Sequence, residues 1–554
     1  MLTLLFFLAA FAAEDPVLEA LDIELDRTMK AWDGVEDAPY YLGYRVVDIQ
    51  RATVSARYGA LYASNENHSR SLGVTARVGT PELDNTHQIR GTFGGQFDST
   101  RFNYEALPVE GDALGIRQAI WRQTDHAIQQ ARQRIVQVRT NIKVKVEEED
   151  QSADFSVEEP SKEINDLANM KLDRPAWEAV LVEVSNRVDA HAKVEQSEVQ
   201  LSATVKNQYF VSSEGVRIRD PLPHYRLSMW ASTSADDGMD LTIYRWLDVH
   251  DLSKLPETAE LEQWADSVVR DLVALRESPR GEPYTGPILL RGRAAGVFIH
   301  EVMGHRVEGH RQKRASEGQT FKEYIGKQLL PTSISIYDDP TIEHYGDYDL
   351  NGYYRYDEEG VPAQRAMLVD KGVFKGFLMS RSPVKGFEKS NGHGRAMESR
   401  RAVARMANTI IETTDPKSED QLRALMRREL KAQDKPFGLI VDELAGGFTL
   451  TGVFMPNSFN IRASTAWRVY ADGRPDELIR GIDLVGTPLV ALGNIVAAGS
   501  DPGVFNGFCG AESGSVPNSA VSPSLFIKQL ELQRKEKNQN RGPLIPRPDE
   551  GGDT

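Results

Sequence analysis

The chain has 554 residues, 40% of them hydrophobic and 26% charged, which is typical of a soluble globular protein with more than one core. Its formal net charge of −16 argues against a bare nucleic-acid backbone as a partner, because such binding depends on neutralising phosphates. The sequence has one cysteine, Cys509, so no disulfide within the chain is possible. Stability must therefore come from packing.

The first thirteen residues have the layout of a short secretory signal. A largely apolar run from Leu2 to Leu8 is followed by small residues at Ala10 and Ala12, and a polar chain begins at Glu14. The run is too short to span a bilayer, which needs about 20 apolar residues. We therefore expect residues 1–13 to be a signal peptide, with export to the periplasm or outside the cell and no stable membrane insertion. If the segment is not a signal, the protein stays in the cytoplasm.

Residues 14–280 are expected to form an α+β domain in which long helices alternate with strands. Apolar residues recur at spacings of three and four in the predicted helices and alternate with polar residues in the predicted strands. The expected helices cover about 16–32, 114–138, 175–188 and 260–275, and the strands lie within 40–78, 209–211 and 225–231. An acidic stretch from Glu147 to Glu163 is expected to be an exposed connection within this domain.

Beyond a linker at residues 278–283, the composition shifts to glycine and short β-rich runs. One clear helix interrupts them, and it begins at Ser418, whose pairing with Gln421 is a capping box. We expect residues 281–533 to form a domain of mostly antiparallel β-sheet around a helix that carries the chemistry. The charged, Pro- and Gly-rich residues 534–554 are expected to be a disordered tail. The predicted fold class is α+β.

A His-Glu-x-x-x-His sequence within Ala294 to His310 is the central chemical feature, and its histidines are His300 and His305. Zinc peptidases often place two histidines four residues apart, about 40° around a helix, so that both rings reach one ion. The spacing of five displaces the second ring by about 140° on a regular helix. Both rings can therefore share an ion only if the helix contains a π-bulge or ends between them, and Gly304 is suited to such a distortion.

Glu301 is the candidate general base, because zinc hydrolases use a carboxylate beside the first histidine to take a proton from water. A catalytic zinc site also needs a third protein ligand. Cys509 is a candidate, since a thiolate suits zinc and ligation would explain a tolerated lone thiol. His310, Glu308 and His344 are alternative candidates for the third ligand. The competing interpretation of Cys509 is a small buried apolar side chain, which is the usual role of a single cysteine.

Further stretches accompany the histidine segment in a consistent order. They are Arg306 to Gly309, Asp357 to Gln364, Val369 to Phe377, Asn391 to Arg395, Gly507 to Gly510 and Ser515 to Pro517. With His300 and His305, they resemble the TldD/PmbA family of metallopeptidases between about Gly286 and Leu532. The N-terminal half is similar mainly in layout and at Ser213 to Gly215.

The resemblance implies one Zn²⁺ per catalytic subunit, held by His300, His305 and Cys509, with Glu301 as the catalytic acid and base. It also implies a two-domain subunit that cuts small or unfolded peptides. Such a subunit dimerises around a cavity, with an identical copy or with a related subunit that lacks the metal ligands. Two features depart from the family: the members are usually cytoplasmic, and His310 stands where an acidic residue is common.

Peptide binding in such a cavity would use exposed strand edges, with main-chain hydrogen bonds that tolerate many sequences. Gly392, Gly394, Gly446 and Gly447 are candidate substrate-binding residues, because a missing side chain permits close backbone approach, although turn-forming glycine is the competing interpretation. The sequence thus predicts a zinc peptidase. The alternatives are a zinc amidase or hydrolase acting on a non-peptide substrate of cell-wall type, and a metal-stabilised assembly partner without turnover.

Overall fold

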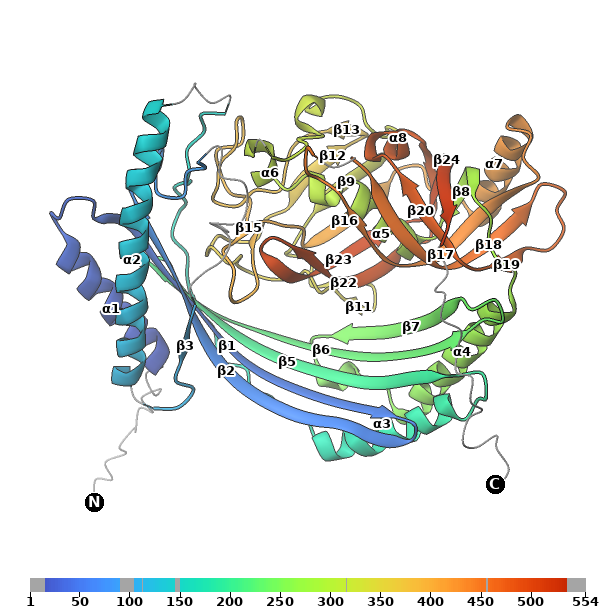
Figure 1. The fold of residues 1–554 in the computed structure, drawn as a ribbon, viewed down its shortest axis with the longest axis horizontal. Coiled ribbons are helices and arrows are strands. Elements are labelled where there is room, and N and C mark those ends of the chain that lie inside the picture. Colours follow the sequence, from blue (N-terminus) through green and yellow to red (C-terminus); the bar gives the residue numbers. More distant parts are fainter. Residues whose placement is uncertain are drawn as a thin grey trace, which may run out of the picture.

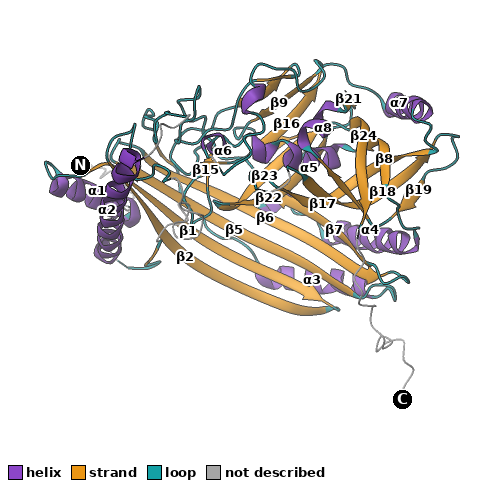
Figure 2. Cartoon of the chain, turned by 45° about the horizontal axis from the view of Figure 1, so that its top comes forward, coloured by secondary structure: helices purple, strands orange, loops and turns teal. Residues whose placement is uncertain are grey.

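The computed structural model describes residues 15–89, 104–111, 113–144, 150–314, 316–454 and 457–535. The predicted signal at residues 1–13 lies outside these ranges, as does the predicted tail beyond Lys535. Helices and strands occur in both halves of the chain (Figure 2), so the fold class is α+β, as predicted. Within the described ranges, no helix is both long and apolar enough to cross a membrane.

The N-terminal half is built on one seven-stranded sheet with long strands. The strands are β1 (Pro39–Arg57), β2 (Ala60–Val78), β3 (Glu105–Leu107), β4 (Lys162–Ile164), β5 (Gln196–Ser212), β6 (Arg217–Ser234) and β7 (Asp240–Val249). Their order is β3-β2-β1-β5-β6, and β4 and β7 pair with different parts of β6. Figure 1 shows this sheet curving beneath the C-terminal half of the molecule.

Local sequence explains the long antiparallel strands. Along β5, the buried side chains of Val199, Leu201 and Val205 alternate with partly exposed ones, which gives the sheet one apolar face. The hairpin between β1 and β2 turns at Tyr58 and Gly59, whose φ angles are 54° and 66°. Two residues with positive φ match the right-handed twist of the flanking strands.

Four helices cover the N-terminal sheet in two pairs. They are α1 (Pro16–Trp32), α2 (Ala113–Val144), α3 (Arg174–Asp189) and α4 (Thr258–Glu277), and the 3-10 turn η1 (Leu252–Lys254) precedes the last. Side chains of α1 and α2 share an apolar core with β1 and β2, whereas α3 and α4 share a second core with β5, β6 and β7. Figure 1 shows α1 and α2 at one end of the sheet and α3 and α4 near the other. The four helices predicted here are confirmed, and α2 extends six residues beyond the predicted end at Val138.

The C-terminal half contains two sheets. The first has the order β13-β12-β9-β16-β23-β22 and comprises β9 (Ile334–Asp338), β12 (Ala366–Asp370), β13 (Val373–Phe374), β16 (Asn408–Thr413), β22 (Gly503–Ala511) and β23 (Gly514–Ser522). The second has the order β17-β8-β24-β20-β18-β19, with β21 on β24, and comprises β8 (Tyr284–Leu290), β17 (Phe437–Thr449), β18 (Phe459–Tyr470), β19 (Glu477–Ile479), β20 (Ile482–Gly486), β21 (Ile495–Ala498) and β24 (Leu525–Arg534).

Most strand pairs of this half are antiparallel, as predicted. Within the described part, the parallel pairs are β16 with β23 and β8 with β17. Two short ladders join β10 (His344–Tyr345) to β11 (Tyr348–Asp349) and β14 (Gly394–Arg395) to β15 (Val403–Ala404).

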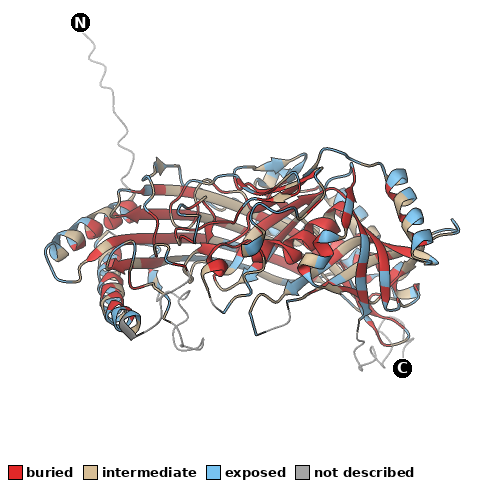
Figure 3. Cartoon of the chain, turned by 90° about the horizontal axis from the view of Figure 1, so that it is seen from above, coloured by how far each residue is buried: buried red, intermediate tan, exposed pale blue. Residues whose placement is uncertain are grey.

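The helix α5 (Gly292–Val302) lies between the two C-terminal sheets. It contacts β17 of one sheet and β22 and β23 of the other, and all of its residues except Arg293 are buried. Figure 3 shows how buried residues follow the strands and fill the centre of this half. The remaining short elements are η2 (Gly304–Arg306), α6 (His310–Lys313), η3 (Lys322–Tyr324), α7 (Glu419–Ala432) and α8 (Pro488–Gly493). The predicted capping box of Ser418 and Gln421 begins α7.

The acidic segment predicted as an exposed connection is only partly exposed: Asp150 and Asp154 to Ser156 are buried, whereas Val157, Glu159 and Pro160 are exposed. Its described part crosses onto the C-terminal half, where Asp150 accepts a hydrogen bond from the N–H of Lys385 (3.0 Å). The N–H of Ser156 donates to the carbonyl of Arg381 (2.9 Å). These residues can be buried because their polar groups find such partners, which lie more than 200 residues away in sequence, where no local pattern shows them.

The predicted division after residue 280 falls between the end of α4 and the start of β8, and 14–280 and 281–533 remain the proposed domains.

One buried arginine contacts both proposed domains. Arg381, in the domain of residues 281–533, is 1% exposed. Its guanidinium donates to both carboxylate oxygens of Glu214 (2.7 and 2.9 Å). It also lies 3.7 Å from the ring centre of Phe155. Glu214 and Phe155 both belong to the domain of residues 14–280. This buried cation therefore joins the two halves.

Replacing Arg381 with Leu is expected to lower the free energy of unfolding by about 3 kcal/mol, because it leaves the Glu214 carboxylate and the Ser156 carbonyl without their partner. Urea unfolding of the full chain measures the change. The exposed Arg474, replaced in the same way, is the control and should shift stability by less than about 0.5 kcal/mol. Equal unfolding midpoints for the Arg381 variant and the wild type would contradict the joining role.

Candidate metal centre

Close packing determines where α5 begins and how it presents His300 and Glu301. A Cβ atom at Gly292 would lie 2.5 Å from the backbone nitrogen of Gly503 in β22, so only glycine lets the helix start against this strand. The helix then runs between the sheets, and its last turn carries His300 and Glu301, which are 7% and 6% exposed. The first two candidate residues are thus held by a helix buried on nearly every side.

The helix ends between the two histidines, as the spacing of five requires. It stops at Val302, Met303 has φ −117° and ψ −47°, and a single 3-10 turn carries His305. The rings of His300 and His305 consequently lie with their centres 5.1 Å apart and their planes at 83°. Of the two geometries that the sequence left open, the helix end is the one observed.

Gly304 serves this break through packing rather than through an unusual backbone angle. Its φ is not positive, whereas a Cβ atom there would lie 2.0 Å from the sulfur of Met406. The buried Met406 side chain thus occupies the space that any larger residue at position 304 would need. The expectation that Gly304 permits the distortion is refined to a steric cause.

Cys509 approaches the histidines from a different sheet. It lies on β22, the edge strand of the six-stranded sheet, and is 3% exposed. Its Sγ is 3.4 Å from Nε2 of His305. The ligand atoms of His300, His305 and Cys509 all lie within 4.8 Å of one another. The fold therefore brings together the three residues predicted as ligands.

The geometry fits a tetrahedral zinc ion. Zinc–nitrogen and zinc–sulfur bonds at a tetrahedral angle separate the two donor atoms by roughly 3.5 Å, close to the observed distance between His305 and Cys509. Two imidazoles and a thiolate leave one position open for water or substrate, as a catalytic site requires. Beside them, Oε2 of Glu301 is buried and has no hydrogen-bond partner among the described residues.

The charges of the site favour a thiolate, the form of cysteine that binds metals. Burial alone would raise the pKa of the Cys509 thiol, but His305, His300 and Arg405 together hold it well below its usual value. Burial likewise opposes the charged form of His305, yet Cys509 and Glu308 raise the pKa of this histidine to about 10. A metal that binds here replaces protons on the imidazoles, so its binding releases protons.

The other nitrogen of each imidazole also has a neighbour. Nδ1 of His300 lies 3.2 Å from the side-chain amide of Asn518 on β23, and Nδ1 of His305 lies 3.3 Å from Oε1 of Glu308. Groups in these positions orient the rings of metal-binding histidines. Glu308, one of the alternatives to Cys509 as third ligand, thus lies behind the ring of His305 rather than beside the sulfur.

The two remaining candidates for the third ligand lie elsewhere. His310 binds Glu512 at 2.6 Å, in a group with Glu308 whose ligand atoms also lie within 4.8 Å of one another. His344 lies in the β10–β11 ladder, where its Nδ1 is 2.7 Å from Asp349.

A cavity of about 400 Å³ opens at the predicted ligands and Glu301. Its lining includes Gly446 and Gly447 of β17 and the aromatic rings of Phe448, Phe505 and Phe508. The three phenylalanines were not predicted, because single aromatic residues in strands carry no signal that separates a cavity wall from a core.

Gly392 and Gly394 lie away from this lining. A Cβ atom at Gly392 would meet the carbonyl of Pro362 at 2.3 Å, and one at Gly394 would meet a carboxylate oxygen of Glu359 at 2.3 Å. Both glycines therefore accommodate close packing within the C-terminal half.

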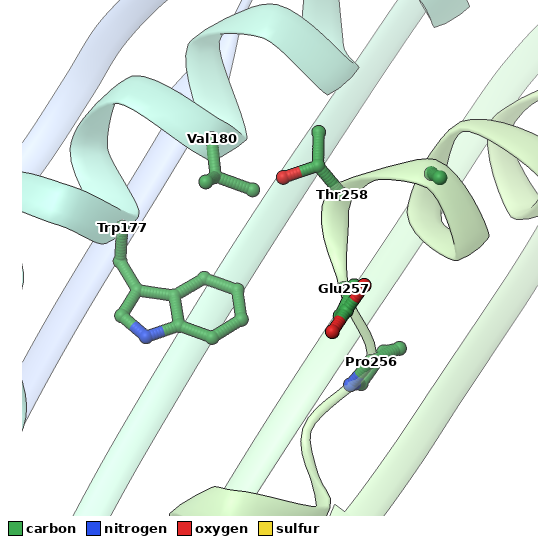
Figure 4. Close-up of a pocket in the computed structure, with 6 residues that line it drawn as sticks. Trp177, Val180, Pro256, Glu257 and Thr258 are labelled. Carbon is green, nitrogen blue, oxygen red and sulfur yellow. The ribbon is translucent and has the colours of Figure 1, made fainter.

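A second pocket lies between α3 and the start of α4 (Figure 4). It is lined by Trp177, Val180 and residues 256–259, and Glu257 is the ionisable group among them. It lacks the histidine and cysteine side chains of the first cavity, and the sequence predicts no chemistry there.

Comparison with known proteins gives a family match in the C-terminal half of the chain. Residues 283–534 match the PmbA/TldA metallopeptidase C-terminal domain. A metalloprotease of Methanothermobacter thermautotrophicus is 28% identical over 333 residues, which cover 58% of this chain and 65% of that protein. A zinc metalloprotease TldD homolog of Saccharolobus solfataricus is 24% identical over 258 residues, which cover 46% and 52%. The aligned region thus spans between half and two thirds of these relatives.

The fold itself extends further than the sequence similarity. The crystal structure of TldE from Thermococcus kodakarensis superposes with a TM-score of 0.60 at 15% identity, covering 93% of this chain and 100% of that one. The fold, the donor set and the relatives together define a member of a metallopeptidase family. The family match is to TldD/PmbA, and it covers residues 283–534, the C-terminal half of the chain.

Replacing Gly304 with Ala is expected to cost about 1–3 kcal/mol of stability, because the new methyl group overlaps Met406. Zinc binding should also weaken, because any backbone shift caused by the added methyl group occurs between the two histidines. Urea unfolding and competition with a zinc chelator measure the two effects. Gly493, where a Cβ atom would meet nothing within 4 Å, is the matched control for an added methyl group. Adding Met406→Ala should restore zinc binding, and failure to do so would contradict the steric explanation.

Proposed function

We propose that the protein is a zinc-dependent peptidase that cleaves small or unfolded peptides, with Zn²⁺ held by His300, His305 and Cys509. One observation carries the proposal. A buried histidine, histidine and cysteine donor set and the buried carboxylate oxygen of Glu301 open onto the same cavity. Two relatives are named metalloproteases, and one of these names specifies zinc, which supports the same chemistry.

Glu301 is proposed as the catalytic acid and base. Bound zinc would supply a Lewis acid that polarises a peptide carbonyl and makes water more acidic. Glu301 would accept a proton from the attacking water through Oε2 and then donate it to the leaving amine. Arg306 anchors the catalytic residue, because its Nη1 donates to the backbone carbonyl of Glu301 (3.0 Å).

The strand edges at the cavity suit an extended peptide. Among the described strands, β22 pairs with β23 alone, so its other edge can offer backbone groups to a substrate main chain near Cys509 and Gly510. Farther along the strand, Trp246 of β7 donates from Nε1 to the carbonyl of Asn506 (2.8 Å). The N-terminal sheet thus covers one end of this edge. Gly446 and Gly447 on the facing wall are proposed to let a substrate backbone approach closely.

Assembly and location are proposed from the sequence and from the family. We propose a dimer of two copies, or a pairing with a related subunit that lacks the metal ligands. The similarity in fold to TldE is compatible with either arrangement. Export follows only from the sequence of residues 1–13.

The variant Glu301→Gln should retain stoichiometric zinc and lose peptide cleavage by about 10²–10⁴-fold, because the amide cannot accept the proton. Elemental analysis and cleavage of a peptide library by the purified protein test this. The exposed Glu260 on α4, replaced by Gln, is the control and should leave the rate unchanged. Full activity in the Glu301 variant would contradict its role. A zinc-loaded wild type that cleaves no peptide would favour the non-peptide or assembly alternatives.

The variant Cys509→Ser should bind zinc at least about 100-fold more weakly than the wild type, since a serine hydroxyl is a poor zinc ligand at neutral pH. Dialysis against a chelator, followed by elemental analysis, measures the retained metal. Ser515→Ala, at an exposed position on the same hairpin, gives the effect of a small change that leaves the thiol in place. Undiminished zinc in the Cys509→Ser protein would exclude the thiolate as the third ligand.

A further inference from the structure

We propose that Glu308 and Arg405 are positioning residues that hold His305 and the strand of Cys509 in register for the metal. The inference rests on the proposed zinc site and extends it to two residues that touch neither substrate nor metal. Both side chains are fully buried, with an exposed fraction of 0%. Fully buried charges are costly to retain unless each is paired and held in place.

Glu308 acts on the far side of the His305 ring. Its Oε1 is 3.3 Å from Nδ1 of His305, whereas Sγ of Cys509 faces the opposite nitrogen, Nε2. The contact is an ion-pair distance. The negative charge beside the nitrogen that does not bind metal favours the tautomer with the proton on Nδ1 and attracts the ring into this orientation. The second oxygen of Glu308 accepts a hydrogen bond from Nε of Arg311 at 2.8 Å, which holds the carboxylate itself in place.

Arg405 acts on the hairpin that carries Cys509. Its Nη2 donates to the carbonyl of Cys509 (2.6 Å), and its Nη1 donates to Oγ of Ser513 (2.8 Å) and to the carbonyl of Gly514 (3.0 Å). These three acceptors belong to both strands of the hairpin and to its turn. One guanidinium therefore fixes the position of the strand from which the Cys509 thiol projects.

The two residues meet each other. Nε of Arg405 lies 3.2 Å from Oε1 of Glu308, an ion pair whose angle falls short of hydrogen-bond geometry. A continuous chain of contacts thus runs from the ring of His305 through Glu308 and Arg405 to the backbone of Cys509. It joins two ligands that are 204 residues apart in sequence.

Charge gives the carboxylate a second effect on the metal. Glu308 lies between the guanidinium groups of Arg311 and Arg405. Arg311 also pairs with Glu317 and Glu512. Without Glu308, however, the buried Arg405 would lose the carboxylate beside it, and its positive charge would oppose the binding of a dication. Loss of Glu308 should therefore weaken metal binding by disorienting His305 and by removing the carboxylate that pairs with Arg405.

The test is zinc affinity of the full-length protein, measured by competition with a chelator of known affinity. Glu308→Gln keeps the size of the side chain and removes its charge, while Arg405→Lys keeps the charge and removes the fork of donors. Each should weaken zinc binding by about 10- to 100-fold. With cobalt(II) in place of zinc, both variants should shift the visible bands, and Arg405→Lys should also change the sulfur-to-cobalt charge-transfer band.

Two controls separate positioning from simple loss of stability. Asp338→Asn changes another fully buried carboxylate that contacts a histidine, with Oδ1 3.2 Å from Nε2 of His393. Arg381→Lys changes another buried arginine. Both should lower the unfolding midpoint while leaving zinc affinity and the cobalt spectrum unchanged. The double variant Glu308→Gln/Arg405→Lys should bind zinc about as weakly as the weaker single variant, because the two residues act through one connection.

Wild-type zinc affinity and an unchanged cobalt spectrum in both single variants would overturn the inference. Equal weakening by the Asp338 and Arg381 controls would do the same, since it would reduce the effect to general instability. If Glu308→Gln does not fold, Arg405→Lys decides alone by the same measurements. A wild-type protein that binds no zinc would instead refute the proposed function, so the two failures are distinguishable.

Discussion

The end of α5 at Val302 is the constraint on which the site depends. A helix that continued regularly would direct His300 and His305 to different sides, and Cys509 could meet only one of them. Ending a helix inside a protein leaves backbone carbonyl groups without partners, which is costly unless a side chain binds them. Arg306 provides this partner, because its Nη1 donates to the carbonyls of Glu301 (3.0 Å) and Val302 (3.5 Å).

The two sheets around α5 divide the remaining tasks. One sheet supplies β22 with its open edge and its cysteine, and the other supplies the wall at Gly446 and Gly447. The long N-terminal sheet lies across the first of these, where Trp246 and Phe505 meet edge to face with ring centres 5.7 Å apart. Long strands, such as β1 with 19 residues and β6 with 18, give that sheet the reach to cover the C-terminal half.

Sequence periodicity was sufficient for the helices and for the capping box at Ser418, because these depend on neighbours within one or two turns. The break after Val302 was also predictable, since a spacing of five is incompatible with a regular helix whose histidines share one ion. Cys509 could be proposed from the chemistry of thiolates and from its family resemblance.

The remaining features depend on contacts between distant parts of the chain. Arg405 and Asn518 follow no local pattern, and nothing in the sequence distinguishes them from other buried polar residues. The same limit explains the misplaced acidic segment after Asp150. It also explains why Gly392 and Gly446 looked alike in sequence, although only the second lies at the cavity.

The separation of 204 residues between His305 and Cys509 has a consequence for biosynthesis. The hairpin of β22 and β23 is synthesised about 200 residues after His305, so a nascent chain holds both histidines long before it holds the thiol. A metal ion that requires all three groups can be acquired only after this hairpin has docked beside α5. Once bound, it favours the docked state by about 4 kcal/mol when its free concentration is about a thousand times the dissociation constant. Metal supply would then separate chains that contain the docked hairpin from chains truncated before it.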